Sequence, residues 1–259
     1  MDFNNKVAVI TGGSSGIGEA TAMEFAKRKS SVVLVARRQE NLDSVSEKLV
    51  RYGSKILAYQ CDVSKRNEVD QMSKTVLDKF GKIDILVNNA GFAIFGSVLE
   101  LQIEDIVSQM ETNYFGMVYC IKAFLPKMLE RRIGHIVNVA SLAGSFGLPG
   151  IAPYCASKFA MLGFSEGLYH ELKGTGVGVT VVSPIMVKTN FFDHPSLKSL
   201  HKYGFATLNP KTVAKAIVRA STSPRSEIIV PPFARGAVWL KHTVPYLINP
   251  IIEAAFRKK

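Results

Sequence analysis

Tyr154 and Lys158 are spaced so that together they could transfer protons. They lie four residues apart in the segment YCASK, so on a helix they would lie one turn apart on the same face. A free tyrosine has a pKa of about 10 and is a poor acid or base near neutrality. A neighbouring ammonium stabilises the phenolate, so we expect Lys158 to lower the pKa of Tyr154 towards the range that acid–base catalysis uses.

Ser141 strengthens this catalytic interpretation, because Tyr-x-x-x-Lys pairs alone are common in helices. It lies thirteen residues before Tyr154, directly after an apolar run, where its hydroxyl can reach the same space. Cys155 lies beside Tyr154, and we interpret it as a small packing residue in preference to a reactive thiol.

A glycine-rich segment near the N-terminus could bind a phosphate group. TGGSSGIG, residues 11–18, lies between the first predicted strand and the first predicted helix. Glycines let the chain turn sharply and let a pyrophosphate approach the backbone, while the helix presents free N–H groups to the anion. The spacing of Gly12, Gly16 and Gly18 is G-x-x-x-G-x-G, and the alternative is a plain glycine-rich turn. The position between strand and helix favours dinucleotide binding.

The residues after the second predicted strand bear on the choice of dinucleotide. Folds that bind NAD place an acidic residue about 20 residues beyond the glycines, where it holds the free ribose hydroxyl. Here that position is Ala36, and Arg37 and Arg38 follow it. A guanidinium pairs with a 2′-phosphate, which a carboxylate would repel. The sequence therefore favours NADP(H); the alternatives are NAD(H) and two solvated arginines that merely open a helix.

The elements that must position these residues alternate along the chain. Apolar strands each followed by a helix are typical of a parallel sheet covered on both faces, and right-handed crossovers make it a doubly wound, Rossmann-like α/β fold. Ligands bind such sheets beyond the carboxyl ends of the strands, where the motifs fall. The predicted strands are 6–10, 31–36, 56–60, 83–87, 135–139, 177–182 and 227–230, and the predicted helices are 16–28, 40–51, 67–80, 101–129 (broken near its middle), 153–173 and 211–220.

From about Lys6 to Val230 the chain resembles the short-chain dehydrogenase/reductase family. One departure is Ile185, which follows Ser183-Pro184 where the family usually has glycine, and we interpret it as a local backbone adjustment near residues 185–190. The family elements occur in order: the glycine segment, Asp62-Val63, Asn88-Asn89-Ala90-Gly91, Asn113, Ser141, Tyr154, Lys158 and Thr189.

The resemblance implies four catalytic residues. Tyr154 would give a proton to the substrate oxygen on reduction and remove one on oxidation, while Ser141 would position the carbonyl. Lys158 would hold the nicotinamide ribose and lower the pKa of Tyr154, and Asn113 would order a water that links Lys158 to solvent.

The resemblance also implies a cofactor-binding set. Asp62 would hold the adenine amino group and Val63 the edge of its ring, with Asn89 and Ala90 on the adenosine ribose side. Thr189 would contact the nicotinamide carboxamide. The expected cofactor residues are Gly12, Ser14, Ser15, Gly16, Ile17, Gly18, Arg37, Arg38, Asp62, Val63, Asn89, Ala90, Gly91, Tyr154, Lys158, Val187 and Thr189.

We therefore predict an NADP(H)-dependent carbonyl reductase or alcohol dehydrogenase, which interconverts a ketone or aldehyde and an alcohol. The segments expected around the substrate (92–95, 145–148 and 185–187) are mostly apolar, and 190–208 is predicted to form a lid, so we expect a lipophilic substrate such as a lipid, a steroid-like molecule or an acyl ketone. The alternative is a non-catalytic nucleotide-binding sensor or scaffold of the same fold.

The chain divides into a predicted Rossmann-type domain, residues 1–231, and an extension, residues 232–259. Of the net charge of +11, residues 201–259 carry +8. In the extension Pro245 and Pro250 should separate short helices. Apolar residues with interspersed cations suit an anionic membrane surface, and the alternatives are packing on the domain or on a partner subunit. We expect no nucleic-acid binding, because no recognised module is visible. The apolar residues of the extension are Phe233, Val238, Trp239, Leu240, Val244, Tyr246, Leu247, Ile251, Ile252 and Phe256.

Several other functions are excluded or given no support. Three scattered cysteines indicate reduced thiols, the five histidines show no metal-ligand spacing, and we expect no metal site. No stretch is long and apolar enough for a membrane span, and we expect no signal peptide. These features predict a cytoplasmic protein, in peripheral contact with a membrane if the extension binds lipid. By the resemblance it would form a homodimer or homotetramer through the long helices that hold Asn113 and Tyr154.

Overall fold

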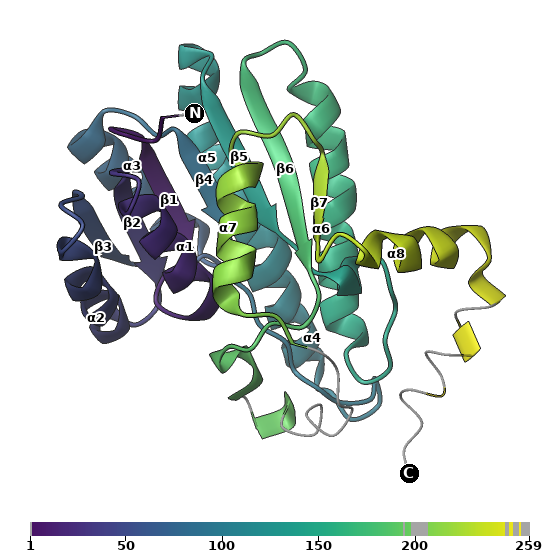
Figure 1. Ribbon diagram of the computed structural model, residues 1–259. Coiled ribbons are helices and arrows are strands. Elements are labelled where there is room, and N and C mark those ends of the chain that lie inside the picture. Colours follow the sequence, from purple (N-terminus) through teal and green to yellow (C-terminus); the bar gives the residue numbers. More distant parts are fainter. Residues whose placement is uncertain (1, 194, 198–206, 247–248, 251–253, 255–259) are drawn as a thin grey trace.

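A seven-stranded parallel sheet forms the centre of the computed structural model, which describes residues 2–193, 195–197, 207–246, 249–250 and 254 (Figure 1). The strand order is β3-β2-β1-β4-β5-β6-β7, and each described pairing is parallel. The predicted doubly wound α/β fold is confirmed. The strands are β1 (Val7–Thr11), β2 (Ser31–Ala36), β3 (Ile56–Gln60), β4 (Ile85–Asn88), β5 (Gly134–Val139), β6 (Val177–Pro184) and β7 (Glu227–Val230).

The helices cover both faces of this sheet, as Figure 1 shows. Helices α1, α2 and α7 pack on one face and α3, α5 and α6 on the other. The predicted spans agree with the structure to within a few residues, because apolar periodicity marks the buried side of each helix. The bounds are α1 (Gly16–Ala26), α2 (Gln39–Val50), α3 (Arg66–Phe80), α4 (Ile103–Met110), α5 (Gly116–Arg131), α6 (Ala152–Glu171), α7 (Pro210–Ala220) and α8 (Ala234–Thr243).

Two hydrophobic cores lie on opposite faces of the sheet, because successive strand side chains point to opposite sides. In β1, Val7 and Val9 belong to the core under α3, α5 and α6, while Ala8 and Ile10 belong to the core under α1, α2 and α7. Strands buried on both faces read as continuous apolar runs, which is why they could be recognised in the sequence.

The predicted break in the helix of residues 101–129 is a wider helical turn. A π-helical turn, η1 (Glu111–Phe115), joins α4 to α5, and the backbone stays helical through it. Such turns accommodate one extra residue and occur frequently at functional sites. Asn113 lies in this turn.

The predicted lid and extension are described in part. A short 3-10 turn, η3 (Asn190–Asp193), follows the strand end, and Pro195 to Leu197 are described beyond it. Leu200, Phe205 and the side chain of Phe192 lie outside the described residues, so the lid over residues 190–208 stays a prediction. In the extension α8 ends at Thr243, shortly before Pro245, which agrees with the prediction that this proline ends a short helix. Leu247, Ile251, Ile252, Phe256, Arg257, Lys258 and Lys259 lie outside the described residues.

The described part of the chain also bears on metals, thiols and membranes. It contains no group of three or more His, Cys, Asp or Glu side chains that could hold a metal ion. No helix within the described ranges is long and apolar enough to span a bilayer. The thiols of Cys61, Cys120 and Cys155 are free and buried.

A buried carboxylate ties together the amino ends of β1 and β4. Asp84 is 4% exposed and accepts a hydrogen bond from the Val7 amide at 2.9 Å. Arg131, Lys82 and Lys6 place cationic nitrogens 3.2, 3.4 and 3.7 Å from its oxygens. Burial alone would raise the pKa of Asp84, but the amide and the three cations hold it below the usual value. The ionised carboxylate therefore stabilises the folded state.

We expect Asp84→Asn to reduce the free energy of unfolding by about 2–4 kcal/mol near neutral pH, because it leaves partly buried cations without their partner. A lowered carboxyl pKa stabilises the fold above the unfolded-state pKa near 4, and the effect is lost as pH falls through the folded-state pKa. Urea denaturation should therefore show a smaller difference at about pH 3. Asp78→Asn, at an exposed position, is the control; an equal loss at both pH values would contradict the assignment.

Candidate active site

The glycine segment forms a tight turn that only glycine accommodates at three positions. Gly12 and Gly16 have φ of 64° and 55°, the left-handed region that side chains disfavour. A Cβ on Gly12 would lie 2.8 Å from the Asn89 amide nitrogen, and one on Gly18 would overlap the Gly12 carbonyl oxygen. A Cβ on Gly16 would lie 3.0 Å from Thr189. The turn thus packs closely against the segments that follow β4 and β6.

Thr11 fixes the turn to the end of β4. Its hydroxyl oxygen accepts hydrogen bonds from the Asn89 and Ala90 amides at 2.9 and 3.0 Å. The Asn89 side-chain amide donates to the carbonyls of Thr11 at 3.0 Å and Gly12 at 3.3 Å. The sequence interpretation missed Thr11, although a hydroxyl residue at the end of β1 is a visible signal. It also gave Asn89 only a ribose contact, whereas the side chain holds the glycine turn in place.

The glycine turn leads into the N-terminus of α1, where the N-cap side chain does not bond to the free backbone N–H groups. Ser15, the N-cap residue, is exposed and its side chain makes no capping hydrogen bond. Ser14 is half-buried beside it, and Ile17 packs against the core under α1, α2 and α7. Free N–H groups and the positive end of the helix dipole together attract an anionic group such as a pyrophosphate.

The ends of β2 and β3 present the residues expected around an adenosine. Arg37 and Arg38 are both exposed directly after β2. The Asp62 carboxylate accepts hydrogen bonds from the Ser64 amide at 3.0 Å and its hydroxyl at 2.8 Å. Val63 is 5% exposed and packs closely on Gly116, where a Cβ would lie 2.8 Å from it. The expected site residues therefore follow the carboxyl ends of β1 to β6, which lie along one edge of the sheet.

Helix α6 and the end of β5 bring Ser141 and Tyr154 together. The Ser141 side chain hydrogen-bonds the Tyr154 hydroxyl, and its oxygen also accepts from the Ala143 amide at 3.1 Å. Burial raises the pKa of Tyr154 above its usual value, and the hydrogen bond with Ser141 opposes that rise. The phenol therefore keeps its proton at neutral pH.

Lys158 lies one turn further along α6 and is 3% exposed. Its Nζ donates to the Val139 carbonyl at 3.1 Å and to the Met161 sulfur at 3.4 Å, and it lies 5.6 Å from the centre of the Tyr154 ring. Burial lowers the pKa of Lys158 to about 7. Both the ammonium and the amine are therefore populated near neutrality.

The expected lowering of the Tyr154 pKa by Lys158 is wrong for this structure. One helical turn does bring the two side chains together, but the Nζ lies over the ring and bonds to Val139 and Met161. Enclosure raises the pKa of Tyr154 and, by the same cause, weakens the charge on Lys158. Spacing along a helix cannot reveal how far both groups are removed from water.

Asn113 is fully buried and fastened at both ends of its side chain. Its oxygen accepts from the Phe92 amide at 2.9 Å, and its nitrogen donates to the Phe92 carbonyl and the Ser157 hydroxyl at 2.9 Å each. Ser157 in turn donates to the Tyr154 carbonyl at 2.7 Å. Gly91 lies between Asn113 and Lys158, since a Cβ there would lie 2.9 Å from the Asn113 oxygen and 3.6 Å from Nζ. Ser157 belongs to the YCASK segment but was not assigned a role from the sequence.

A buried chain of polar side chains fixes α6 to the sheet beneath this site. Asn88 donates to Asn138 at 2.8 Å, Asn138 to Ser165 at 2.9 Å, and Ser165 to the Met161 carbonyl at 2.6 Å. These bonds connect β4, β5 and the helix that carries Tyr154 and Lys158.

An apolar cluster surrounds Tyr154. Its buried members are Ala93, Ala143, Ile151, Cys155 and Leu197, with Phe95, Leu148 and Phe191 packed against them. The Phe191 ring lies 5.7 Å from that of Tyr154, and the Phe95 amide donates to the Ser196 hydroxyl at 3.0 Å. The segments after β4, β5 and β6 thus meet at Tyr154. Burial raises the pKa of the Cys155 thiol, in keeping with a packing residue.

The segment after β6 keeps a regular backbone despite Ile185. The Ile185 amide donates to the Val230 carbonyl at 2.9 Å, which continues the pairing with β7. Val187 pairs with Leu208, and Thr189 donates to the Val187 carbonyl at 3.4 Å. Thr189 also lies against the glycine turn, because a Cβ on Gly16 would be 3.0 Å from its side chain. Its expected contact with the nicotinamide stays a prediction.

The fold and these side chains define an oxidoreductase of the Rossmann type. A family model described as short chain dehydrogenase matches residues 6–198, and the chain belongs to the short-chain dehydrogenase/reductase family. Retinol dehydrogenase 10-B of Danio rerio is 36% identical over 265 residues, which cover 93% of this chain and 79% of that protein.

Two solved structures share the whole architecture. A short chain dehydrogenase/reductase from Burkholderia phymatum in complex with NAD superposes with a TM-score of 0.88 at 29% identity, covering 95% of this chain and 96% of that chain. An alcohol dehydrogenase from the archaeon Thermococcus sibiricus, complexed with 5-hydroxy-NADP, gives a TM-score of 0.78 at 29% identity, covering 87% and 96%.

We expect Lys158→Met to stabilise the fold while it removes the amine. A lysine whose pKa is lowered on folding destabilises the folded state fully below pH 7, and the effect fades as pH rises towards the unfolded-state pKa near 10.5. Because one pKa unit corresponds to about 1.4 kcal/mol, the shift from 10.5 to about 7 sets an upper limit of about 5 kcal/mol; the hydrogen bond to Val139 that is lost offsets part of this, so we expect a gain on the order of 2 kcal/mol at about pH 6.5. Thermal denaturation at about pH 6.5 and pH 9.5 should show the gain shrinking. Exposed Lys74→Met is the control, and a pH-independent difference would contradict the burial argument.

Proposed function

We propose that the protein is an NADP(H)-dependent oxidoreductase that interconverts a ketone or aldehyde and an alcohol, with Tyr154 as proton donor and acceptor. The observation that carries the proposal is the convergence of Ser141, Tyr154 and Lys158 at an apolar cluster, with the Lys158 Nζ 5.6 Å from the centre of the Tyr154 ring, next to a glycine turn suited to an anion. Catalytic roles for Tyr154, Lys158, Ser141 and Asn113 are part of this proposal.

The side chains suit reduction of a carbonyl. A protonated Tyr154 can donate to an oxygen that develops alkoxide character, because an alcohol is a far weaker acid than a phenol. Ser141, already bonded to the same hydroxyl, can donate to that oxygen and orient it. Lys158 has a pKa of about 7 and can supply or take a proton near the tyrosine ring, and Asn113 keeps the backbone at Phe92 beside it in place.

The residues present fit a nicotinamide dinucleotide. The left-handed glycines and the uncapped α1 terminus leave room and free N–H groups for a pyrophosphate. When bound, such a cofactor supplies the hydride. We propose NADP(H) over NAD(H), because Arg37 and Arg38 are exposed after β2 and no carboxylate occupies position 36. The similar structures include one complex with NAD and one with an NADP derivative, so the preference rests on these two arginines.

The substrate that this site fits is lipophilic. Phe95, Leu148, Ile151, Phe191 and Leu197 surround the ring of Tyr154. The relative from Danio rerio is named for retinol, an apolar alcohol, which agrees with this substrate class.

The competing function is a nucleotide-binding sensor or scaffold without catalysis. The hydrogen-bonded set of Ser141, Tyr154, Asn113 and Ser157 favours the enzyme, because binding a nucleotide alone has no need of a phenol held by a serine.

We further propose a homodimer or homotetramer that packs through the long helices that hold Asn113 and Tyr154, which are α4 with α5, and α6. Ile103 and Val107 lie one turn apart on α4 and are 64% and 46% exposed, and Phe115 at the end of η1 is 43% exposed. The stacked rings of Phe115 and Tyr119 extend this apolar surface, which a second copy could cover.

We expect Tyr154→Phe to lower NADPH oxidation with ketones by at least ~100-fold, because the proton donor is lost while the ring still packs. Steady-state absorbance with a panel of apolar ketones and aldehydes measures this, and NADPH titration should show unchanged binding. Tyr52→Phe, which removes a hydroxyl far from the site, is the control. No turnover by the unaltered protein with any carbonyl, together with tight nucleotide binding, would favour the scaffold.

We expect Arg37→Gln with Arg38→Gln to weaken NADPH binding about tenfold or more and to leave NADH binding unchanged, because a guanidinium bond to a phosphate is charge-assisted. Fluorescence titration with each cofactor measures the ratio, and Arg51→Gln is the matched control. Equal binding of NADPH by the double variant and the unaltered protein would refute the NADP(H) preference and leave NAD(H) open.

A further inference from the structure

Helix α8 leaves the body of the protein at the free edge of the sheet. Figure 1 shows it extending sideways beyond the end of β7. Among its described residues only Ala234 is buried. Phe233, Trp239 and Tyr246 are 81%, 65% and 70% exposed. Large aromatic side chains exposed together on one projecting segment indicate an interaction surface, because they do not stabilise the fold by burial.

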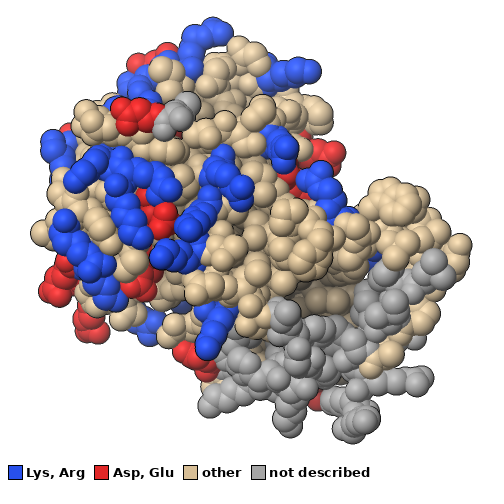
Figure 2. All heavy atoms as spheres, viewed as in Figure 1, with Lys and Arg blue, Asp and Glu red and all other residues tan. Residues whose placement is uncertain are grey.

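The charge of this segment has one sign. Arg235 and Lys241 lie on α8, and the sequence has no Asp or Glu between Glu227 and Glu253. Within the described ranges neither cation belongs to an ion pair; Arg235 donates to the Glu227 carbonyl at 3.3 Å, and Lys241 lies 6.0 Å from the Phe146 ring centre. In the view of Figure 2 the projecting part is mainly neither acidic nor basic, with Lys and Arg near its base. The complementary surface is therefore apolar and negative.

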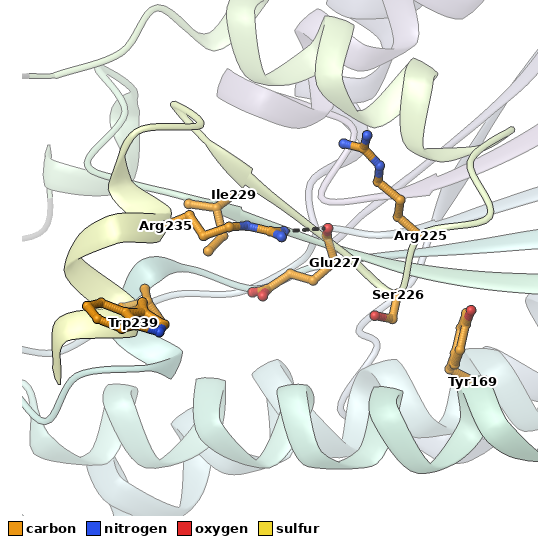
Figure 3. A pocket seen from close by; sticks show the side chains of 8 residues that line it. Tyr169, Arg225, Ser226, Glu227, Ile229, Arg235 and Trp239 are labelled. Carbon is orange, nitrogen blue, oxygen red and sulfur yellow. Dashed lines mark hydrogen bonds between the residues drawn. The ribbon is translucent and has the colours of Figure 1, made fainter. Parts of the chain in front are cut away.

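A hollow of about 710 Å³ lies where α8 meets the sheet edge and α6. Ile229, Val238 and Trp239 give it an apolar side. Figure 3 shows Arg235 and Arg225 on either side of Glu227, with the hydroxyls of Ser226 and Tyr169 nearby. The Glu227 carboxylate also lines the hollow, where it accepts a hydrogen bond from the Ser183 hydroxyl at 2.7 Å, but the two guanidinium groups outnumber it. Together with the hydroxyl and indole groups they suit the phosphate and glycerol region of a phospholipid.

A second copy of the chain fits this face less well. Residues 233–246 contain Arg235 and Lys241 and no Asp or Glu, so two such faces would bring like charges together. Pairing through the free edge of β7 is also hindered, because the Arg235 side chain already bonds to the Glu227 carbonyl on that strand. An anionic bilayer supplies both the negative charge and the apolar interior that the face lacks.

We propose that α8 and its flanks, residues 233–246, are a docking face for an anionic phospholipid membrane. The inference does not depend on the reaction proposed above. It gives that reaction a context, because Lys241 contacts Phe146 in the loop that also supplies Leu148 and Ile151 to the apolar cluster around Tyr154. Docking would therefore hold the substrate side of the protein next to the lipid that dissolves an apolar substrate.

Trp239 is the only tryptophan of the chain and reports directly on this docking. We expect its emission to shift to shorter wavelength when the full-length protein meets vesicles in which about a third of the phosphatidylcholine is replaced by phosphatidylglycerol. Vesicles of phosphatidylcholine alone should give little shift, and high salt should weaken the response. We also expect nitroxide-labelled lipids to quench the emission of Trp239, because quenching requires the indole to enter the bilayer.

Paired substitutions separate the two contributions in vesicle co-sedimentation. Arg235→Gln with Lys241→Gln should weaken binding to the anionic vesicles about tenfold or more, since each cation near such a surface contributes ~1 kcal/mol. Phe233→Ser with Trp239→Ser should weaken it by a similar factor. Matched controls are Lys65→Gln with Lys74→Gln for exposed cations and Val50→Ser with Ile133→Ser for exposed apolar residues. All variants are first checked for unchanged thermal unfolding.

Failure of the docking face and failure of the proposed reaction are distinguishable, because ketone reduction is assayed without lipid. No emission shift with anionic vesicles, equal binding to neutral vesicles, or equal losses in the control variants would overturn the membrane proposal. A fall in oligomer mass on sedimentation of the Phe233 and Trp239 variant, without any vesicle binding by the unaltered protein, would assign the face to a second copy instead.

Discussion

The site depends on a joint between two strands that are neighbours in the sheet and far apart in the sequence. Next to β1 the chain winds outwards in opposite directions, to β2 and β3 on one side and β4 to β7 on the other. Such a reversal of strand order opens a crevice at the sheet edge, where ligands bind in folds of this kind. The Thr11 hydroxyl and the Asn89 amide fasten the two sides of that crevice together, so the glycine turn cannot shift without moving the segment after β4.

The second constraint is the enclosure of Lys158. An amine held with a pKa of about 7 destabilises the folded chain, and the surrounding structure must offset this. The chain from Asn88 through Asn138 to Ser165 anchors α6 on the sheet, and Asn113 and Ser157 anchor it on the neighbouring helix. Proton transfer requires the Lys158 amine and the Tyr154 phenol to be held in a fixed orientation, and these hydrogen bonds hold the helix that carries both.

The sequence allowed the sheet, the helices on both faces and the pairing of Tyr154 with Lys158 and Ser141 to be predicted, because each leaves a local pattern. The direction of the Tyr154 pKa shift could not be predicted, since it depends on residues such as Phe191 that join the ring from a distant segment. Contacts of Thr11 with Asn89 and of Asn113 with Ser157 were likewise invisible, because they join positions far apart along the chain. The continuous helical backbone at η1, predicted as a break, depends on hydrogen bonding that propensity does not encode.

That π-helical turn has an effect on helix orientation as well as on Asn113. One residue advances an α-helix by about 100°, so the inserted residue sets the angle between the side chains before and after it. Ile103 and Val107 face solvent on α4 while Cys120 and Phe124 face the core on α5, and a single residue determines that offset. Removing one residue from Glu111–Phe115 would rotate the side chains of α4 by about 100° relative to those of α5, so the buried faces of the two helices would no longer both meet the core. The same π-helical turn therefore determines both where the Asn113 side chain lies and how α4 is rotated relative to α5.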